Sequence, residues 1–331
     1  MGQLPGQKVN VVKRYTSEIL FSKSSLLPWL LLIALLPLLI ATFFTYQAAK
    51  NSLQDQVEER LSHIAKEKVY QFENYIQERK ADINELALSP EVLQLVNKFK
   101  KTQSVQSLQS YAEESLGYYL DISYQGYTDI YLISPKGEIW YSTNSAILPG
   151  AAISQLAQKF NQLTRVYDEA NTLMSVQISD IEINENNVLP HFYLGTPVFE
   201  SGRISAVLIL SLPSDRIRKV LTTTSNLGQS GETIMAQSIG NERVLSSKKK
   251  LTLEEMSLFR NTEMGKIVRE AGWGTSGYGK LIDQNKVSVL AAWQYLPSLG
   301  WGILVKMNLS EAFAPIVQLR RQLYLLIALT L

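Results

Sequence analysis

The feature that most constrains this chain is an uncharged, apolar stretch near its N-terminus. Residues 24–49 contain no Asp, Glu, Lys or Arg, and residues 26–44 read LLPWLLLIALLPLLIATFF. A helix of this length is long enough to cross a hydrocarbon core about 30 Å thick, and its two prolines are tolerated in a spanning helix. A signal peptide would have a shorter apolar region, about 7–15 residues, followed by a small-residue cleavage site, and no clear site follows here. The sequence therefore predicts an uncleaved transmembrane helix over residues 24–45.

Flanking charges orient this predicted helix. Residues 1–23 contain one acidic residue, Glu18, against four basic residues, Lys8, Lys13, Arg14 and Lys23. The positive-inside rule predicts that residues 1–23 lie in the cytoplasm and that residues of about 46–320 lie outside the membrane.

The last residues of the sequence repeat the apolar pattern. After Arg320 and Arg321 the chain reads QLYLLIALTL, which is too short to cross a bilayer. We expect residues 309–331 to form an exit helix and the start of a second transmembrane helix. The alternative is a C-terminal helix that packs in a core.

Composition excludes several classes of protein. The 331 residues are 46% hydrophobic and carry a net charge of +2, which is unlike a disordered chain and too balanced for a dedicated nucleic-acid binder. The absence of cysteine excludes disulfides, thiolate metal sites and thiol catalysis. A histidine-based metal site or a Ser-His-Asp triad would have to use His63 or His191, the two histidines of the chain. We expect no metal and no other cofactor.

A long helix is predicted to continue out of the first membrane segment. Residues 41–89 contain neither Gly nor Pro, and their apolar residues recur at helical spacing up to Ser89-Pro90, which ends the pattern. We assign residues 46–89 to a stalk helix. Its apolar stripe either forms the seam of a homodimer, which we expect, or packs against its own domain.

Two α+β modules are predicted to follow the stalk. Residues 90–213 begin with a helical stretch, then show a hairpin at residues 128–143, a helix-like piece at 153–163, and strand candidates at 173–183, 191–199 and 204–212. Residues 214–308 repeat the arrangement on a smaller scale. Its strand candidates lie at 233–237, 243–246, 277–282, 287–294 and 302–306, with a helical stretch at 253–270.

One glycine motif does not carry nucleotide chemistry. Residues 272–277 match G-x-G-x-x-G, but the predicted order is helix, glycines, strand, whereas a dinucleotide site needs the strand first and the helix last. We therefore interpret these glycines as a turn.

The first module contains the candidate binding residues. Seven of the 16 tyrosines fall within residues 111–141, beside Trp140, and aromatic walls with polar tips suit a small-ligand pocket. Ordinary core packing is the alternative for each of them. No pair of carboxylates has a spacing that favours acid–base catalysis, so we predict no catalytic residue. The candidate ligand-binding residues are Tyr127, Asp129, Tyr131, Trp140, Tyr141, Tyr167, Asp180, His191 and Tyr193.

Three segments resemble a known family of sensor domains. Residues 226–233, NLGQSGET, resemble the glycine-rich segment that opens the membrane-proximal half of double Cache domains. Residues 296–302 and 311–316 resemble the closing segment of that half, and residues 196–212 resemble the final hairpin of the distal half.

The resemblance implies two PAS-like modules on a long helix, at the inner membrane of a bacterium. It places residues 90–213 in a membrane-distal module that binds a small molecule and residues 214–308 in a membrane-proximal module. The amino-acid-binding members carry an Arg-x-Trp-Tyr segment and a downstream Asp. Trp140-Tyr141 lacks that preceding Arg, which leaves the ligand open.

Such domains are the input regions of larger receptors. We expect a two-component sensor histidine kinase, with a chemoreceptor or a cyclic-dinucleotide enzyme as the alternatives. A membrane-tethered extracytoplasmic enzyme and an envelope scaffold are the alternatives from other classes. The sequence contains no catalytic constellation of its own.

Overall fold

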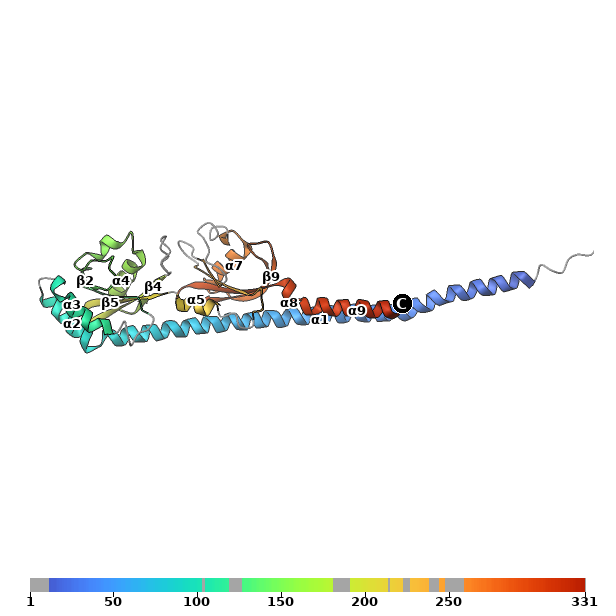
Figure 1. The fold of residues 1–331 in the computed structure, drawn as a ribbon, viewed down its shortest axis with the longest axis horizontal. Coiled ribbons are helices and arrows are strands. Elements are labelled where there is room, and N and C mark those ends of the chain that lie inside the picture. The colour runs from blue at the N-terminus through green and yellow to red at the C-terminus, as the bar shows by residue number, and fades with distance from the viewer. Residues whose placement is uncertain are drawn as a thin grey trace, which may run out of the picture. The chain divides into compact units, whose positions relative to one another are not determined.

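The computed structural model describes residues 12–102, 105–118, 127–180, 191–213, 215–222, 227–237, 244–247 and 259–330. Two compact units are formed, one by Met1–Val57 with Ala312–Leu331 and the other by Glu58–Glu311. The second unit contains two antiparallel sheets, which are labelled with their helices in Figure 1.

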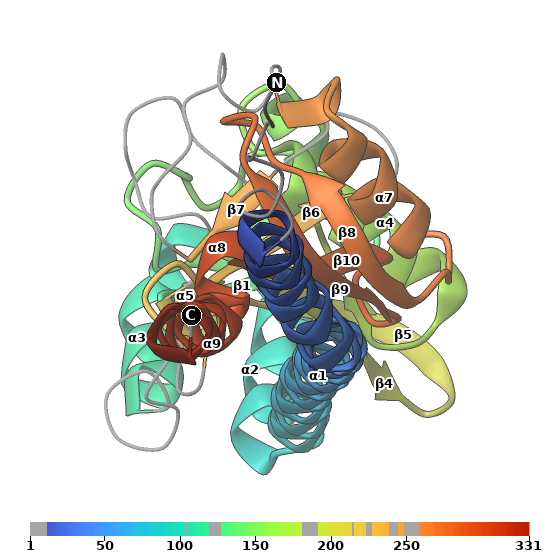
Figure 2. The same ribbon diagram turned by 90° about the vertical axis from the view of Figure 1, so that its right-hand side faces the viewer.

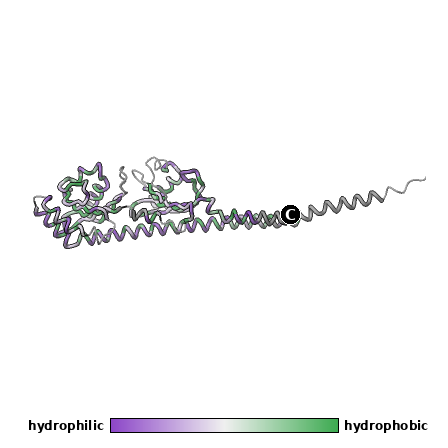
Figure 3. The backbone as a smooth tube through the Cα atoms, in the orientation of Figure 1, coloured by the Kyte–Doolittle hydropathy of each residue, from purple (hydrophilic) through white to green (hydrophobic). Residues whose placement is uncertain are grey.

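One long helix, α1, runs over Val12–Ala87. Within the second unit its apolar residues alternate with charged ones, and the tube of this part of α1 carries both purple and green segments in Figure 3. Phe72, Ile76 and Ile83 are fully buried. The next helix, α2 (Pro90–Lys101), begins with Ser89 as its N-cap, whose hydroxyl accepts a hydrogen bond from the Val92 N–H at 3.3 Å.

The first sheet has the strand order β2-β1-β5-β4-β3 and lies within residues 90–213, which we call the distal module after the position that the family resemblance implies. The hairpin predicted at 128–143 is confirmed as β1 (Asp129–Ile133) and β2 (Ile139–Ser142). The long hairpin of β4 (His191–Glu200) and β5 (Arg203–Pro213) is also confirmed, and β3 (Gln177–Ile178) closes the edge. The helices of this module are α3 (Gln109–Tyr118), α4 (Asn161–Leu173) and the short 3-10 helices Val105–Leu108 and Ile153–Leu156.

The proximal module repeats this topology. Its sheet has the order β7-β6-β10-β9-β8, which corresponds strand for strand to the distal order. The strands are β6 (Glu232–Gln237), β7 (Val244–Ser246), β8 (Gly277–Ile282), β9 (Ser288–Leu296) and β10 (Trp301–Asn308). The helices are α5 (Asp215–Thr222) and α7 (Glu263–Ala271), and α8 (Leu309–Ala312) and α9 (Ala314–Thr330) follow the sheet.

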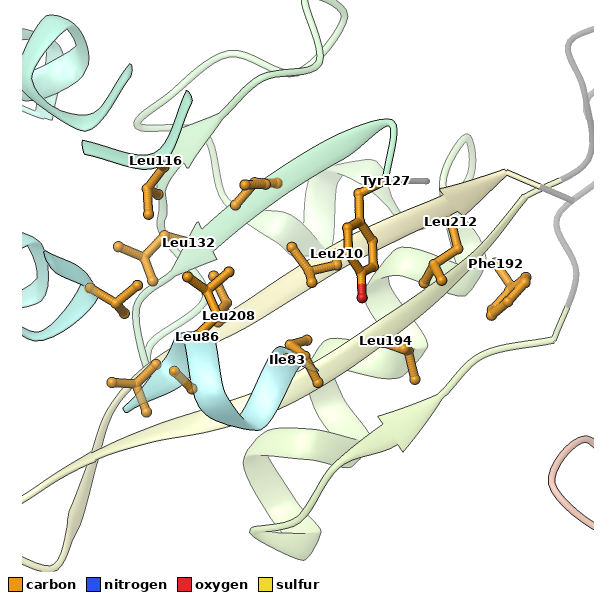
Figure 4. Packing of buried hydrophobic residues seen from close by; sticks show 14 of the residues in the cluster. Ile83, Leu86, Leu116, Tyr127, Leu132, Phe192, Leu194, Leu208, Leu210 and Leu212 are labelled. Carbon is orange, nitrogen blue, oxygen red and sulfur yellow. The ribbon is translucent and has the colours of Figure 1, made fainter. Parts of the chain in front are cut away.

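Each sheet is covered on both faces. One face packs against α1 and its neighbours in a single hydrophobic core that contains residues of both sheets. In Figure 4, Leu208, Leu210 and Leu212 of β5 point toward the helical segment that carries Ile83 and Leu86. The opposite face of the distal sheet packs under α4, and that of the proximal sheet packs under α7. Figure 2 shows α4 and α7 on the side of the strands away from α1.

Two predicted elements differ from the structure. The segment 153–163 is only a 3-10 turn at its start, and the helix lies later, at Asn161–Leu173. The strand predicted at 173–183 is reduced to Gln177–Ile178 in the described part. Residues 181–190, and residues 253–258 of the helical stretch predicted at 253–270, lie outside the described residues. The later part of that stretch forms α7.

The transmembrane helices predicted at residues 24–45 and 309–331 are not identified in the described part of the structure. Among the residues that it describes, no helix is both long enough and apolar enough to cross a membrane. More than half of the side chains of residues 24–45, and all of those of residues 323–331, lie outside the described part of the chain.

Candidate functional site

Four of the predicted binding residues lie on one face of the distal sheet, the face under α4. Strand alternation places Asp129 on the same side of β1 as Tyr131, and His191 on the same side of β4 as Tyr193. The register joins them through β5, because Asp129 and Tyr193 both pair with Ser211. Asn144, two residues beyond the end of β2, completes the group, because its side-chain amide donates to the Tyr131 hydroxyl at 3.4 Å. We call Asp129, Tyr131, Asn144, His191 and Tyr193 the distal polar cluster.

The two tyrosines form the buried wall of the cluster. Tyr131 and Tyr193 are at most 1% exposed, and their ring centroids lie 6.1 Å apart in an edge-to-face arrangement. The His191 Nε2 atom lies 2.8 Å from the Tyr193 hydroxyl. His191, Asp129 and Asn144 are each partly exposed, so solvent reaches the polar side of the cluster.

Asp129 is the charged group of the cluster. Burial raises the pKa of this carboxyl, while the charge of His191 and hydrogen bonds from Thr128, Asn144 and Thr143 oppose the rise. The net direction is upward, because the effect of burial outweighs the charge of His191 and these hydrogen bonds. Such a carboxylate favours a cationic or hydrogen-bond-donating partner.

The helix α4 closes over this face at a glycine. A Cβ atom at Gly195 would lie 3.3 Å from the Val166 carbonyl oxygen, so the small residue lets α4 approach β4 closely. Tyr167, another predicted binding residue, lies on α4, and its hydroxyl donates to the Ser134 carbonyl at 2.9 Å. Burial raises the pKa of Tyr167. This tyrosine therefore anchors α4 to the β1–β2 turn and is not part of the distal polar cluster.

Three predicted binding residues lie on the opposite face, toward α1 and α2. The Tyr127 hydroxyl donates to Asp82 of α1 at 3.1 Å, and burial raises its pKa. Trp140 stacks on Phe99 of α2 with ring centroids 5.6 Å apart. Tyr141 belongs to the same core, and burial raises its pKa to about 12. A register shift between β1 and β2 lets both Trp140 and Tyr141 join this core, although adjacent strand residues normally face opposite sides.

Asp180 lies at the junction of the two modules and not in the cluster. Its Oδ2 atom accepts hydrogen bonds from Arg165 of α4 at 2.7 Å and from the Gln237 side chain of β6 at 2.8 Å. The indole N–H of Trp301 approaches its Oδ1 at 3.4 Å. The carboxylate therefore joins the helix over the distal cluster to two strands of the proximal sheet.

Sequence reasoning missed Asn144 and Ser211. No local sequence pattern marks either residue. Strand register places Ser211 opposite Asp129, and hydrogen bonds place Asn144 beside Asp129 and Tyr131. No group of acidic and histidine residues suited to a metal ion occurs among the residues that the structure describes. The glycines of 272–277 follow α7 and precede β8, which confirms the turn interpretation.

A family model described as Cache domain, dCache_1, matches residues 49–316. A search of curated proteins gives no match.

Several solved structures share the fold. The sensory domain of the Campylobacter jejuni chemoreceptor Tlp3 (CcmL) superposes with a TM-score of 0.57 at 12% identity, covering 80% of this chain and 98% of that one. The ligand-binding domain of Mlp24 with asparagine has a TM-score of 0.54 at 15% identity, covering 80% and 99%. That of the Pseudomonas aeruginosa PAO1 chemoreceptor PctC in complex with GABA has 0.54 at 12%, covering 76% and 100%.

Proposed function

The chain belongs to the Cache family of sensor domains, and from this premise we propose that it is the extracytoplasmic, ligand-sensing region of a bacterial membrane receptor. In this proposal the distal module binds a small molecule at the distal polar cluster. The proximal module passes the change to the helices that lead to the membrane.

This assignment rests on the arrangement of the side chains in the distal polar cluster. Three partly exposed polar side chains, Asp129, Asn144 and His191, converge from three segments of the chain on a wall of two buried tyrosines. Binding sites for small molecules combine such an aromatic wall with a few convergent polar groups.

The similar structures support this reading. They include Tlp3 bound to isoleucine, Mlp24 with asparagine and PctC with GABA, all small molecules that carry an amino group. The neighbours named as receptors are chemoreceptors, which favours a chemoreceptor over the histidine kinase expected from the sequence. Similarity at such low sequence identity shows the fold alone. The choice between a chemoreceptor and a histidine kinase is therefore part of the proposal.

Membrane anchoring and dimerisation belong to the same proposal. The uncharged residues 24–45 would cross the inner membrane, and the apolar residues after Arg321 would begin a second crossing. The apolar stripe of the stalk supports a homodimer. Neither nucleic acid nor a metal is a partner in this account.

A thermal-shift screen of the purified chain against small metabolites tests the function. A ligand that binds the native state raises the melting temperature, by an amount that grows with its concentration. We expect at least one metabolite to do so, and we expect His191→Ala to remove that shift. Tyr278→Ala on β8 of the proximal module serves as the control. A shift that survives His191→Ala and is lost in Tyr278→Ala would contradict a distal site.

A further inference from the structure

Strand β8 is the outermost strand of the proximal sheet, whose order is β7-β6-β10-β9-β8. It pairs with β9 in an unbroken antiparallel register, from Gly277 opposite Trp293 to Ile282 opposite Ser288. Its other side pairs with no strand among the residues that the structure describes. β8 therefore presents an edge to which a further strand can pair.

The other sheet edges are covered or shorter. The edge strand β2 of the distal sheet is itself paired, because the Ile139 N–H donates to the Ala151 carbonyl at 3.0 Å and the Gly150 N–H donates to the Ile139 carbonyl at 2.7 Å. In the described part of the chain, the edge strand β3 has two residues and β7 has three. β8 has six residues, so it is the longest uncovered edge that the structure describes.

The hydrogen bonds around β8 fix which of its backbone groups point outward. The Asp283 N–H, one residue beyond the strand, donates to the Val287 carbonyl at 2.9 Å, which continues the pairing with β9. Antiparallel strands bond through alternate residues, so the odd-numbered residues of β8 bond toward β9 and the even-numbered ones direct their N–H and C=O groups away from it. The Ile282 N–H agrees with this alternation, because it donates to the Glu263 carboxylate of α7 at 3.3 Å.

Tyr278 and Lys280 form the uncovered part of this edge. Among the residues that the structure describes, neither has a partner for its backbone N–H. Their side chains share one face of the sheet with that of Ile282, and Tyr278 and Ile282 are 54% and 52% exposed. Trp273, in the turn before β8, and Val287, in the turn after it, are exposed as well. Exposed aromatic and aliphatic side chains in one region are typical of protein interaction sites.

We propose that β8 is a docking edge at which an extended segment of a separate protein adds an antiparallel strand, with an acidic side chain opposite Lys280. Lys280 is the one charged residue of β8, so an acidic cross-strand neighbour complements it and a basic one is repelled. Apolar side chains of the added strand would lie opposite Tyr278 and Ile282. Strand addition of this kind takes its affinity from main-chain hydrogen bonds and its specificity from alternate side chains.

A second copy of this chain fits the edge less well. Two β8 strands that pair antiparallel with full overlap place Lys280 opposite Lys280 of the other copy. Like charges directly opposite each other in a sheet are destabilising. This lysine therefore selects against self-pairing and in favour of a partner strand that carries a carboxylate.

The first test measures the binding of a labelled probe peptide, acetyl-Thr-Val-Thr-Glu-Thr-Val-Thr-amide, to the purified full chain by fluorescence anisotropy. We expect saturable binding, and weaker binding of the same peptide with Lys in place of Glu. Lys280→Glu should reverse this preference, with a change of up to about five-fold for each peptide. Absence of binding, or a preference that Lys280→Glu leaves unchanged, would overturn the inference.

The second test separates backbone pairing from charge attraction. Lys280→Pro removes an outward N–H and leaves the ladder to β9 intact, whereas Lys280→Ala removes the charge and keeps that N–H. Circular dichroism and thermal melting check that both variants fold. We expect the Pro variant to bind the probe peptide at least about five-fold more weakly than the Ala variant, because it also loses a main-chain hydrogen bond. Equal binding by the two variants would contradict strand addition.

A third test determines the register and does not require the Pro variant to fold. The chain has no cysteine, and a Cβ atom at Gly279 would have no heavy atom within 4 Å, so Gly279→Cys adds a single accessible thiol. The probe peptide carries a 2-pyridyl disulfide on a cysteine placed directly after or directly before its Glu. Antiparallel pairing of Glu with Lys280 places the following residue opposite position 279, so that peptide should release 2-thiopyridone faster.

The control for this exchange is Gly117→Cys on α3, where a Cβ atom also has no heavy atom within 4 Å. The two peptides should react with it at the same rate. Equal rates of the two peptides with Gly279→Cys would overturn the proposed register and the inference with it.

Two further outcomes identify what is wrong if the inference fails. Concentration-dependent self-association in sedimentation velocity that Lys280→Pro abolishes would show that the occupant is a second copy and not a separate protein. The inference does not depend on the distal polar cluster. If a metabolite shift is lost in His191→Ala while no peptide binds at β8, the docking edge is wrong and the sensor function stands.

Discussion

At the scale of single residues, two carboxylates, one in each module, have pKa values that are shifted in opposite directions. Asp129 carries a raised pKa because burial outweighs its neutral hydrogen-bond donors and His191. In the proximal module burial also acts to raise the pKa of Asp283, but hydrogen bonds from the Val287 N–H, the Lys306 ammonium and the Asn285 N–H hold it below its ordinary value. The backbone N–H of Val287 makes the largest contribution to the lowered pKa of Asp283, and the Lys306 ammonium adds to it.

Asp129→Asn is expected to stabilise the ligand-free chain slightly at pH 7. A carboxyl whose folded-state pKa lies above its unfolded value makes the native state bind the extra proton, so stability falls as the pH rises through that interval. The substitution removes this penalty. Urea unfolding of both proteins at pH 7 and near pH 3.5 measures it, and the advantage of the variant should shrink at the lower pH. A larger advantage at the lower pH would be inconsistent with this sign.

Lys306→Met is expected to cost about 3–5 kcal/mol in the free energy of unfolding. The variant keeps the side-chain length but leaves Glu232 and Asp283 as two buried carboxylates without their shared cation. Denaturant unfolding at pH 7 gives the value. A cost below about 1 kcal/mol would show that the ammonium does not compensate these charges.

At the scale of elements, much of the architecture follows from hydrophobic pattern. The strands β1, β2, β4 and β5 are predictable because turn residues separate short β-rich runs. The helix predicted at residues 153–163 lies too early in the sequence. The residues that form the buried face of α4 follow the i, i+3, i+4, i+7 spacing of a helix, namely Leu163, Val166, Tyr167 and Ala170.

The candidate site was predictable only in part. The sequence indicates that tyrosines gather near β1, but the face that each one occupies depends on strand register. Strand β5 pairs with both β1 and β4 and so brings together Asp129, Tyr131, His191 and Tyr193. The irregular register between β1 and β2 places Trp140 and Tyr141 in the core on the other face of the sheet. Asp180 contacts Gln237, which lies far from it in the sequence, and no local sequence pattern predicts such a contact.

The loop that precedes β6 is hydrogen-bonded to α8, the helix that follows the last strand of the proximal sheet. The Glu311 carboxylate of α8 accepts the N–H groups of Gln229 at 2.7 Å and Ser230 at 2.8 Å. Gly228 has a φ of +69°, and a Cβ atom there would lie 2.2 Å from the Glu311 Oε1. A glycine at position 228 therefore allows both the left-handed backbone conformation of the turn and the close approach of the Glu311 carboxylate.

Gly228→Ala is expected to destabilise the chain more than Gly202→Ala. Both glycines have positive φ, which costs a non-glycine residue about 1 kcal/mol or more, but nothing lies within 4 Å of a Cβ atom at Gly202. The difference in unfolding free energy between the two variants isolates the contact with Glu311. Equal costs for the two variants would mean that Glu311 moves aside freely.

At the scale of the whole molecule, the two modules of the second unit are connected through shared packing and polar contacts. A single core contains residues of α1 and of both sheets. Glu73 of α1 accepts the Ser298 N–H at 2.9 Å, and the Lys68 ammonium donates to the Val220 carbonyl at 2.6 Å. Asp180 adds the link from α4 to β6. These contacts connect α4, which covers the proposed ligand site, to the proximal sheet.

Asp180→Ala is expected to lower the free energy of unfolding by about 1–3 kcal/mol, because Arg165 and Gln237 lose their shared acceptor. Asp168→Ala, at an exposed position on α4, is the control and should change stability by less than about 0.5 kcal/mol. Urea unfolding compares the two. If Asp180→Ala is as neutral as its control, the junction does not depend on this carboxylate.

Hydrogen–deuterium exchange of the purified chain, with and without a metabolite that raises its melting temperature, tests whether the distal module holds the ligand at its polar cluster. The account predicts slower exchange in residues 128–131, 143–146 and 191–195, which carry the cluster. It predicts little change in the corresponding proximal segments 232–236 and 289–293. Protection confined to those proximal segments, with the distal ones unchanged, would contradict the account.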